Sequence, residues 1–238
     1  MRAISLDEGT PGNLRKYVIE TTTYNFSVNI SSNLANALAM RYLGFDIVSL
    51  GVLTSLRTLS AGFGGLAGLP LIYKFRGRRL LLWLVFGSIN RVGWALLIVS
   101  VFLPPPWGSI YLVAAVTAVQ AAGSVAGLAS ADTLADMVKP SMAARFFGSV
   151  GSLNNLVSLL ALILTIVVFK FYDVNTAYRI LYFTALITAL ISTVVLASIR
   201  DEYRPRGDDI PIWGVSSLIR KYKDVAISNL YSRRYVAI

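Results

Sequence analysis

Three long stretches of this sequence contain no lysine, arginine, aspartate or glutamate. They cover residues 92–131, 146–169 and 180–199, and they are 40, 24 and 20 residues long. An α-helix needs about 20 apolar residues to cross the hydrocarbon core of a bilayer. The first stretch is too long for one crossing, and it contains the sequence PPPWG at residues 104–108, which breaks a helix. The pattern therefore predicts several membrane-spanning helices.

The composition excludes several other classes of protein. Hydrophobic residues make up 55% of the chain and charged residues only 14%, whereas soluble domains carry about 25% charged residues. The chain has no cysteine, which excludes disulfides and thiolate chemistry, and no histidine, the commonest general base and metal ligand. We expect no enzyme activity, no cofactor and no metal site.

Three more segments complete a set of six predicted spans. The second and third spans are apolar apart from one arginine each, Arg57 and Arg91. The first is the most polar, since it holds Glu20, Arg41 and many hydroxyl and amide side chains. It is counted as a span because an odd number would put the two basic ends of the chain on opposite sides of the membrane. These spans are predicted at residues 17–43, 47–73 and 80–103.

The lysines and arginines predict the orientation of the six spans. Most of the 22 basic residues fall in the two tails and in the loops at 74–79 and 137–145, which all lie on one side of the membrane. Short loops rich in lysine and arginine face the cytoplasm. We therefore expect a multi-pass protein of the cell membrane with both termini in the cytoplasm. The net charge of +10 then reflects orientation, and no nucleic acid is expected as a partner.

Three regions follow from this pattern. Residues 1–16 are predicted to form a cytoplasmic tail, and residues 17–199 a six-span transmembrane domain. Residues 200–238 are predicted to hold a cytoplasmic linker, an amphipathic helix and the possible start of a seventh span. Apolar residues recur at helical spacing from Ile212 to Ala226, opposite a basic face, which is typical of a helix lying on a membrane surface. Packing of this helix on another protein segment is the alternative.

The loop between the second and third spans has a recognisable motif. Residues 65–79 read GLAGLPLIYKFRGRR, a glycine-rich helix end followed by a short basic loop. This segment resembles the signature of the major facilitator superfamily, in which a glycine, an aspartate, a basic residue, a glycine and two basic residues follow at fixed spacing. Gly77, Arg78 and Arg79 match that signature. Lys74 stands where the family usually has its aspartate, and Pro70 where it has the leading glycine.

A second segment carries the same resemblance. Residues 131–148 read ADTLADMVKPSMAARFFG, which is similar to the family's join between spans 4 and 5. The resemblance covers the whole chain. It implies an all-α membrane protein that forms one six-helix half of a major-facilitator-type fold. It also implies a secondary transporter that moves a small solute by alternating access.

Charged residues at the cytoplasmic ends of the spans are predicted to form a gate. Asp132 and Asp136 share one helix face because they are four residues apart. Basic residues of the neighbouring loops are expected at the same depth, where they could hold helix ends together in one state and release them in another. Solvation of helix ends and orientation of the chain are the alternative roles. The candidate gate residues are Lys74, Arg76, Gly77, Arg78, Arg79, Asp132, Asp136 and Arg145.

Polar side chains within the spans are predicted to line a substrate cavity. Asn25, Asn29, Asn33 and Asn36 fall on one face of the first span, and lipid cannot satisfy their amides. The resemblance implies that this span and the fourth, which carries Gln120, line a central cavity. Hydrogen bonding between helices is the alternative reading.

Arg57 and Arg91 are predicted near the middle of the membrane, where a cation marks a functional site by default. No carboxylate is expected at their depth, since Glu20 and Asp46 are placed near helix ends. The two arginines are therefore candidates for binding an anionic substrate. They could instead pair with an acid in a missing half or cap backbone carbonyls.

Six spans are half of the family's usual twelve. The expected partners are therefore the lipid bilayer, a small-molecule substrate, for which an anion is a candidate, and a missing carboxyl-terminal half or a second copy of the chain. A non-transporting membrane subunit or a truncated carrier remnant is the main alternative. A membrane phosphotransferase using Asp132, Asp136 and Arg145 is a remote one, because the spacing is wrong and no second acidic pair follows.

Overall fold

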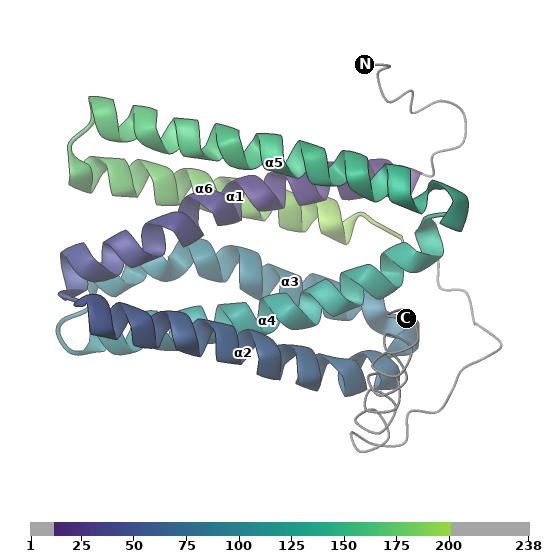
Figure 1. Ribbon diagram of the computed structural model, residues 1–238, viewed down its shortest axis with the longest axis horizontal. Helices are drawn as coiled ribbons and strands as arrows, with labels where there is room; N and C mark the ends of the chain where they lie inside the picture. The colour runs from purple at the N-terminus through teal and green to yellow at the C-terminus, as the bar shows by residue number, and fades with distance from the viewer. Residues whose placement is uncertain (1–11, 201–238) are drawn as a thin grey trace, which may run out of the picture. The chain divides into compact units, whose positions relative to one another are not determined.

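The computed structural model describes residues 12–200, which fold entirely into helices joined by short connections (Figure 1). Two 3-10 helices flank the third α-helix: η1 (Arg76–Arg78) precedes it and η2 (Leu96–Phe102) continues it. The α-helices are α1 (Gly12–Leu43), α2 (Ile47–Lys74), α3 (Arg79–Ala95), α4 (Trp107–Met137), α5 (Pro140–Phe171) and α6 (Val174–Ala197).

Five helical segments are long and apolar enough to cross a membrane. They are α2, α3 together with η2, α4, α5 and α6. The prediction of an all-α protein with several apolar helices is therefore confirmed, and the fold is that expected of a multi-pass membrane protein. Among residues 12–200 the apolar spans number five and not the expected six. The exception is α1, whose hydroxyl and amide side chains lower its mean hydropathy.

The helix ends follow local sequence signals. Asp46 and Asp173 occupy the N-cap positions of α2 and α6, where their carboxylates accept hydrogen bonds from the backbone N–H groups of Ser49 (2.8 Å) and Thr176 (3.0 Å). The Thr176 N–H holds the pKa of Asp173 below its usual range. Gly44 takes a positive φ of 69° in the turn between α1 and α2, a conformation that glycine adopts without strain.

The six α-helices pack as two groups of three. α1 contacts α5 and α6 extensively, while α4 contacts α2 and α3, and α3 also packs on α6. In Figure 1 the helices α1, α5 and α6 form the upper group and α2, α3 and α4 the lower one. Because each connection is short, consecutive helices run in opposite directions. The starts of α1 and α3 therefore lie at the same end of the body as the join between α4 and α5.

The buried apolar side chains form two separate clusters. One contains Trp94 and Leu181 and lies toward the end where α1 meets α2. The other contains Trp83 and Leu196 and lies toward the opposite end. Along α1, α3 and α6, the stretch of chain between the two clusters carries buried polar residues, including Glu20. A polar layer therefore interrupts the core.

Large apolar side chains cover much of the outside, most densely on α2 and α5. Such a surface would be unfavourable in water but suits the lipid phase. The most exposed of them on α2 and α5 include Ile47, Val48, Phe63, Leu66, Ile166 and Phe171.

Two boundaries differ from those predicted. α1 begins at Gly12 and not at residue 17, so residues 12–16 of the expected cytoplasmic tail are helical. The third span is α-helical only to Ala95 and continues as a 3-10 helix to Phe102. The predicted amphipathic helix and the start of a seventh span lie outside the described residues.

Candidate functional site

Glu20, Arg91 and Ser192 form a buried polar cluster between α1, α3 and α6. A carboxylate oxygen of Glu20 pairs with Nη2 of Arg91, and the two side chains are only 2% and 3% exposed. Nε of Arg91 donates to Oγ of Ser192 at 3.0 Å. The Ser192 hydroxyl lies 3.2 Å from the backbone carbonyl oxygen of Glu20 and 3.3 Å from its carboxylate, as a donor to either. The charges of Glu20 and Arg91 are therefore compensated inside the body.

This pair corrects the expectation that no carboxylate lies at the depth of the two arginines. If α1 began at residue 17, Glu20 would lie in its first turn. The helix begins at Gly12, so Glu20 lies about 12 Å from the helix start at 1.5 Å per residue. Arg91 lies about 18 Å from the start of α3 on the same scale. The long side chain of Arg91 spans the difference between these two distances.

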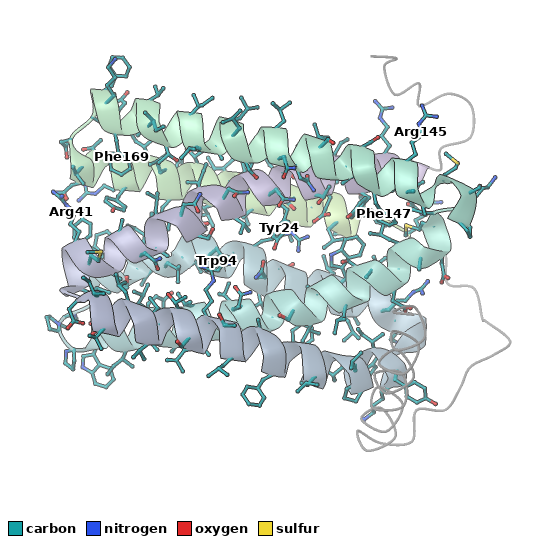
Figure 2. All side chains as sticks on the ribbon, viewed as in Figure 1. Tyr24, Arg41, Trp94, Arg145, Phe147 and Phe169 are labelled. Atoms are coloured by element: carbon teal, nitrogen blue, oxygen red, sulfur yellow. The ribbon has the colours of Figure 1, made fainter. Side chains whose placement is uncertain are left out.

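Tyr24 and Asn90 extend this cluster toward α4. The Tyr24 hydroxyl donates to Oδ1 of Asn90 at 2.9 Å, and Nδ2 of Asn90 donates to the backbone carbonyl of Val119 at 2.8 Å. The Arg91 guanidinium carbon also lies 4.7 Å from the centroid of the Tyr24 ring, within cation–π range. Figure 2 shows Tyr24 midway along the helical body.

A small cavity of about 90 Å³ adjoins the cluster and is lined in part by Glu20, Tyr24, Asn90 and Arg91. It has room for a few water molecules. It is far smaller than the roughly 300–1,000 Å³ of a typical small-molecule site. Gly123 also borders it, and a Cβ at this position would lie 3.1 Å from Cγ of Asn90. Glycine at position 123 therefore allows α4 to pack closely against Asn90 of α3.

Arg57 occupies a different site, on α2 facing α4. Its Nε donates to Oε1 of Gln120 at 3.2 Å, and its guanidinium carbon lies 4.6 Å from the centroid of the Trp94 ring. Among residues 12–200 no carboxylate pairs with it. The structure thus brings together Arg57 and Gln120, two of the residues predicted for the cavity, whereas Arg91 bonds to Glu20 and Ser192.

The four asparagines of α1 have different surroundings. Nδ2 of Asn25 donates to the Thr21 carbonyl at 2.7 Å, and Nδ2 of Asn29 donates both to the Asn25 carbonyl at 2.7 Å and to Oγ of Ser158 on α5 at 2.9 Å. Asn29 therefore joins α1 to α5, whereas the amide of Asn25 bonds within α1. Asn33 and Asn36 are exposed.

The aspartates predicted for the cytoplasmic gate lie against Arg79. Asp136 pairs with Nη2 of Arg79 at 2.5 Å, and Asp132 pairs with its Nη1 at 3.2 Å. The Arg79 and Asp136 side chains are buried, with 2% and 5% exposure, whereas Asp132 is 34% exposed. Nη1 of Arg79 also donates to the Asp132 carbonyl at 3.1 Å. One arginine therefore links the start of α3 to the end of α4.

The other predicted gate residues lie near this cluster in sequence but have different surroundings. Gly77, Arg78 and Arg145 are exposed. Lys74 is exposed as well, with its Nζ 5.7 Å from the centroid of the Phe75 ring. Arg76 lies in η1. Figure 2 shows Arg145 near the start of α5 and Arg41 at the opposite end of the body.

Sequence reasoning missed Ser192, Tyr24, Asn90 and Trp94 as contacts of charged residues. None of them stands out in the sequence, because serine, asparagine and aromatic residues are common in membrane helices. One signal was present: Glu20 is the only carboxylate within the predicted first span and Arg91 the only charge within the third.

No family model, no curated protein and no solved structure matches this chain.

Proposed function

We propose that the six helices of this chain form one half of a secondary transporter of the major facilitator type, which moves a small solute across the cell membrane by alternating access. The observation that carries the proposal is the packing of the helices. α1 packs on α5 and α6 as α4 packs on α2 and α3, and α3 meets α6. Exchanging the first three helices with the last three reproduces these contacts. An inverted repeat of three helices is the internal plan of each six-helix half in that superfamily.

We propose α1 as the sixth span in spite of its polarity. Its 32 residues are long enough for a crossing. Several of its polar side chains bond inside the protein: the Ser27 hydroxyl donates to the Ala185 carbonyl at 2.6 Å, and the Ser31 hydroxyl to the Ser27 carbonyl at 2.8 Å. A polar helix can cross a membrane when its polar groups face protein or a water-filled cavity.

The proposed orientation puts both termini in the cytoplasm. Among residues 12–200, the end of the body with Arg79 holds most of the lysines and arginines, whereas the opposite end carries Arg41, Lys170 and Arg179. This asymmetry supports a cytoplasmic location for the Arg79 end.

The Arg79 cluster is the proposed cytoplasmic gate. Arg79 ties α3 to α4 through Asp132 and Asp136. Breaking and remaking such contacts is how helix ends separate and close in alternating access. The same contacts argue against the phosphotransferase, since both aspartates are already engaged by a cation.

A complete transport path requires a second six-helix half in this proposal. Asn33 and Asn36 of α1 expose their amides, which hydrocarbon cannot satisfy. A second copy of the chain or a separate carboxyl-terminal half would cover them. A non-transporting membrane subunit is the alternative that the experiment must exclude.

Uptake by proteoliposomes tests the proposal. The full chain is reconstituted, the vesicles are incubated with a defined mixture of small metabolites, and the lumenal contents are compared by mass spectrometry with those of protein-free vesicles. The matched variants are Arg79→Gln, in the cluster, and Lys139→Gln, exposed at the same end. We expect accumulation of at least one solute, reduced in Arg79→Gln and retained in Lys139→Gln. Contents equal to those of protein-free vesicles for every solute would contradict the proposal.

A further inference from the structure

The two arginines within the spans differ in how their charge is compensated. Arg91 pairs with Glu20. Arg57 lies about 15 Å along α2 from Ile47 at 1.5 Å per residue, and it has no ion-pair partner among residues 12–200. A cation at such a depth in a bilayer is unfavourable and marks a functional site by default.

The neighbours of Arg57 hold the guanidinium but do not neutralise it. Gln120 accepts a hydrogen bond from Nε, and the buried Trp94 ring lies beside the guanidinium. An arginine has five N–H donors. The four on Nη1 and Nη2 have no hydrogen-bond partner within the described part of the chain.

Gln120 adds a further donor to the same place. Its Oε1 accepts from Arg57, so its amide nitrogen, which can only donate, is held next to the guanidinium. Both side chains are half-buried, so they remain within reach of a ligand. The site thus combines hydrogen-bond donors, a full positive charge and an aromatic wall, and no carboxylate lies against it.

We propose that Arg57, Gln120 and Trp94 bind the carboxylate or phosphate group of a small organic anion. The Nη1 and Nη2 fork of Arg57 receives the two oxygens, the geometry in which arginine binds such groups most strongly. The Gln120 amide donates to the same group, and Trp94 fixes the plane of the guanidinium. This inference names the substrate class of the transporter and rests on the proposed function. It assigns no such role to Arg91, because Glu20 already compensates the charge of that arginine.

The thermal stability of the full chain in detergent tests the site. The probes are benzoate, lactate and inorganic phosphate at constant ionic strength, and the neutral amides benzamide and lactamide serve as controls. We expect at least one anion to raise the melting temperature in a saturable way, and its amide to have no effect. Arg57→Gln should lower the affinity for that anion at least about ten-fold. Arg179→Gln, an exposed arginine at the end of the body, should leave its affinity unchanged.

Two further variants keep the test informative if Arg57→Gln does not fold. Arg57→Lys keeps the charge but loses the fork, so it should fold and bind the anion more weakly than the wild type. Gln120→Leu removes no charge from the protein, and it should lower the affinity for the anion.

Three results would overturn the inference: no saturable anion effect, an effect that survives in both Arg57 variants, or an oligomer that dissociates in Arg57→Gln without any anion binding. The last would identify the counter-charge as a carboxylate of a partner chain. The transport assay separates this inference from the proposed function. Uptake of neutral solutes that is unaffected by Arg57→Gln would support the proposed transport function and refute the anion site. Anion binding without uptake of any solute would support the anion site and refute the transport function.

Discussion

Glu20 of α1 and Arg91 of α3 form an ion pair that joins the two groups of helices. α1 belongs to the group with α5 and α6, and α3 to the group with α2 and α4. Ser192 of α6 bonds to both charged residues and lies beside the pair. The polar layer between the two apolar clusters is therefore a junction between the halves of the six-helix body.

Removal of one partner of this pair should destabilise the protein strongly. In Glu20→Gln the Arg91 charge stays buried without compensation, which typically costs about 3–5 kcal/mol. The double variant Glu20→Gln/Arg91→Gln removes both charges, and we expect it to be more stable than either single variant. The test is to measure the free energy of unfolding in detergent for the wild type, both single variants and the double variant. Additive losses in the double variant would show that the two charges do not interact.

The two aspartates bound to Arg79 should contribute unequally. Asp136 is nearly buried, so Asp136→Asn should cost about 3–5 kcal/mol. Asp132 is one-third exposed, and Asp132→Asn should cost about 1 kcal/mol or less. Chemical unfolding of the two variants in the same detergent compares them, with Arg145→Gln as an exposed control. A larger loss for Asp132→Asn would contradict the geometry of the cluster.

Gly64 should be required for the contact between α2 and α4. A Cβ at this position would lie 2.7 Å from the Cα of Ala121, which is backbone and cannot move aside. Gly64→Ala should therefore cost about 1–3 kcal/mol through overpacking. Gly62 lies on the same helix with nothing within 4 Å of its Cβ position, so Gly62→Ala is the matched control and should lose no stability. Equal melting temperatures for the two variants would argue against this packing.

The helices of this chain could be predicted because their signal is local. Long stretches without charge and the proline-rich break before Trp107 define most helix boundaries to within a few residues. The start of α1 was missed because residues 12–16 include only one apolar side chain, Leu14, and their contacts with the rest of the body, such as the bond from Lys16 to the Ser198 carbonyl, are tertiary. Local sequence does not encode that contact.

The pairing of the charged residues could be predicted only in part. The spacing of Asp132 and Asp136 places them on one face, but the choice of Arg79 among several nearby cations follows from the packing of α3 on α4. Similarly, Arg57 and Gln120 were both identified as site residues. Their contact depends on the register between α2 and α4, which close packing at Gly64 helps to set.

In the proposed topology, the polar helix α1 crosses the membrane as the first of six spans. The chain has no cysteine, so a single introduced cysteine reports its own exposure to a membrane-impermeant maleimide. Gly12→Cys and Arg41→Cys mark the two ends of α1, with Gly77→Cys and Asn175→Cys as references for the two ends of the body. In intact cells we expect labelling at positions 41 and 175, and at positions 12 and 77 only after permeabilisation. Labelling of positions 12 and 41 from the same side would contradict the account.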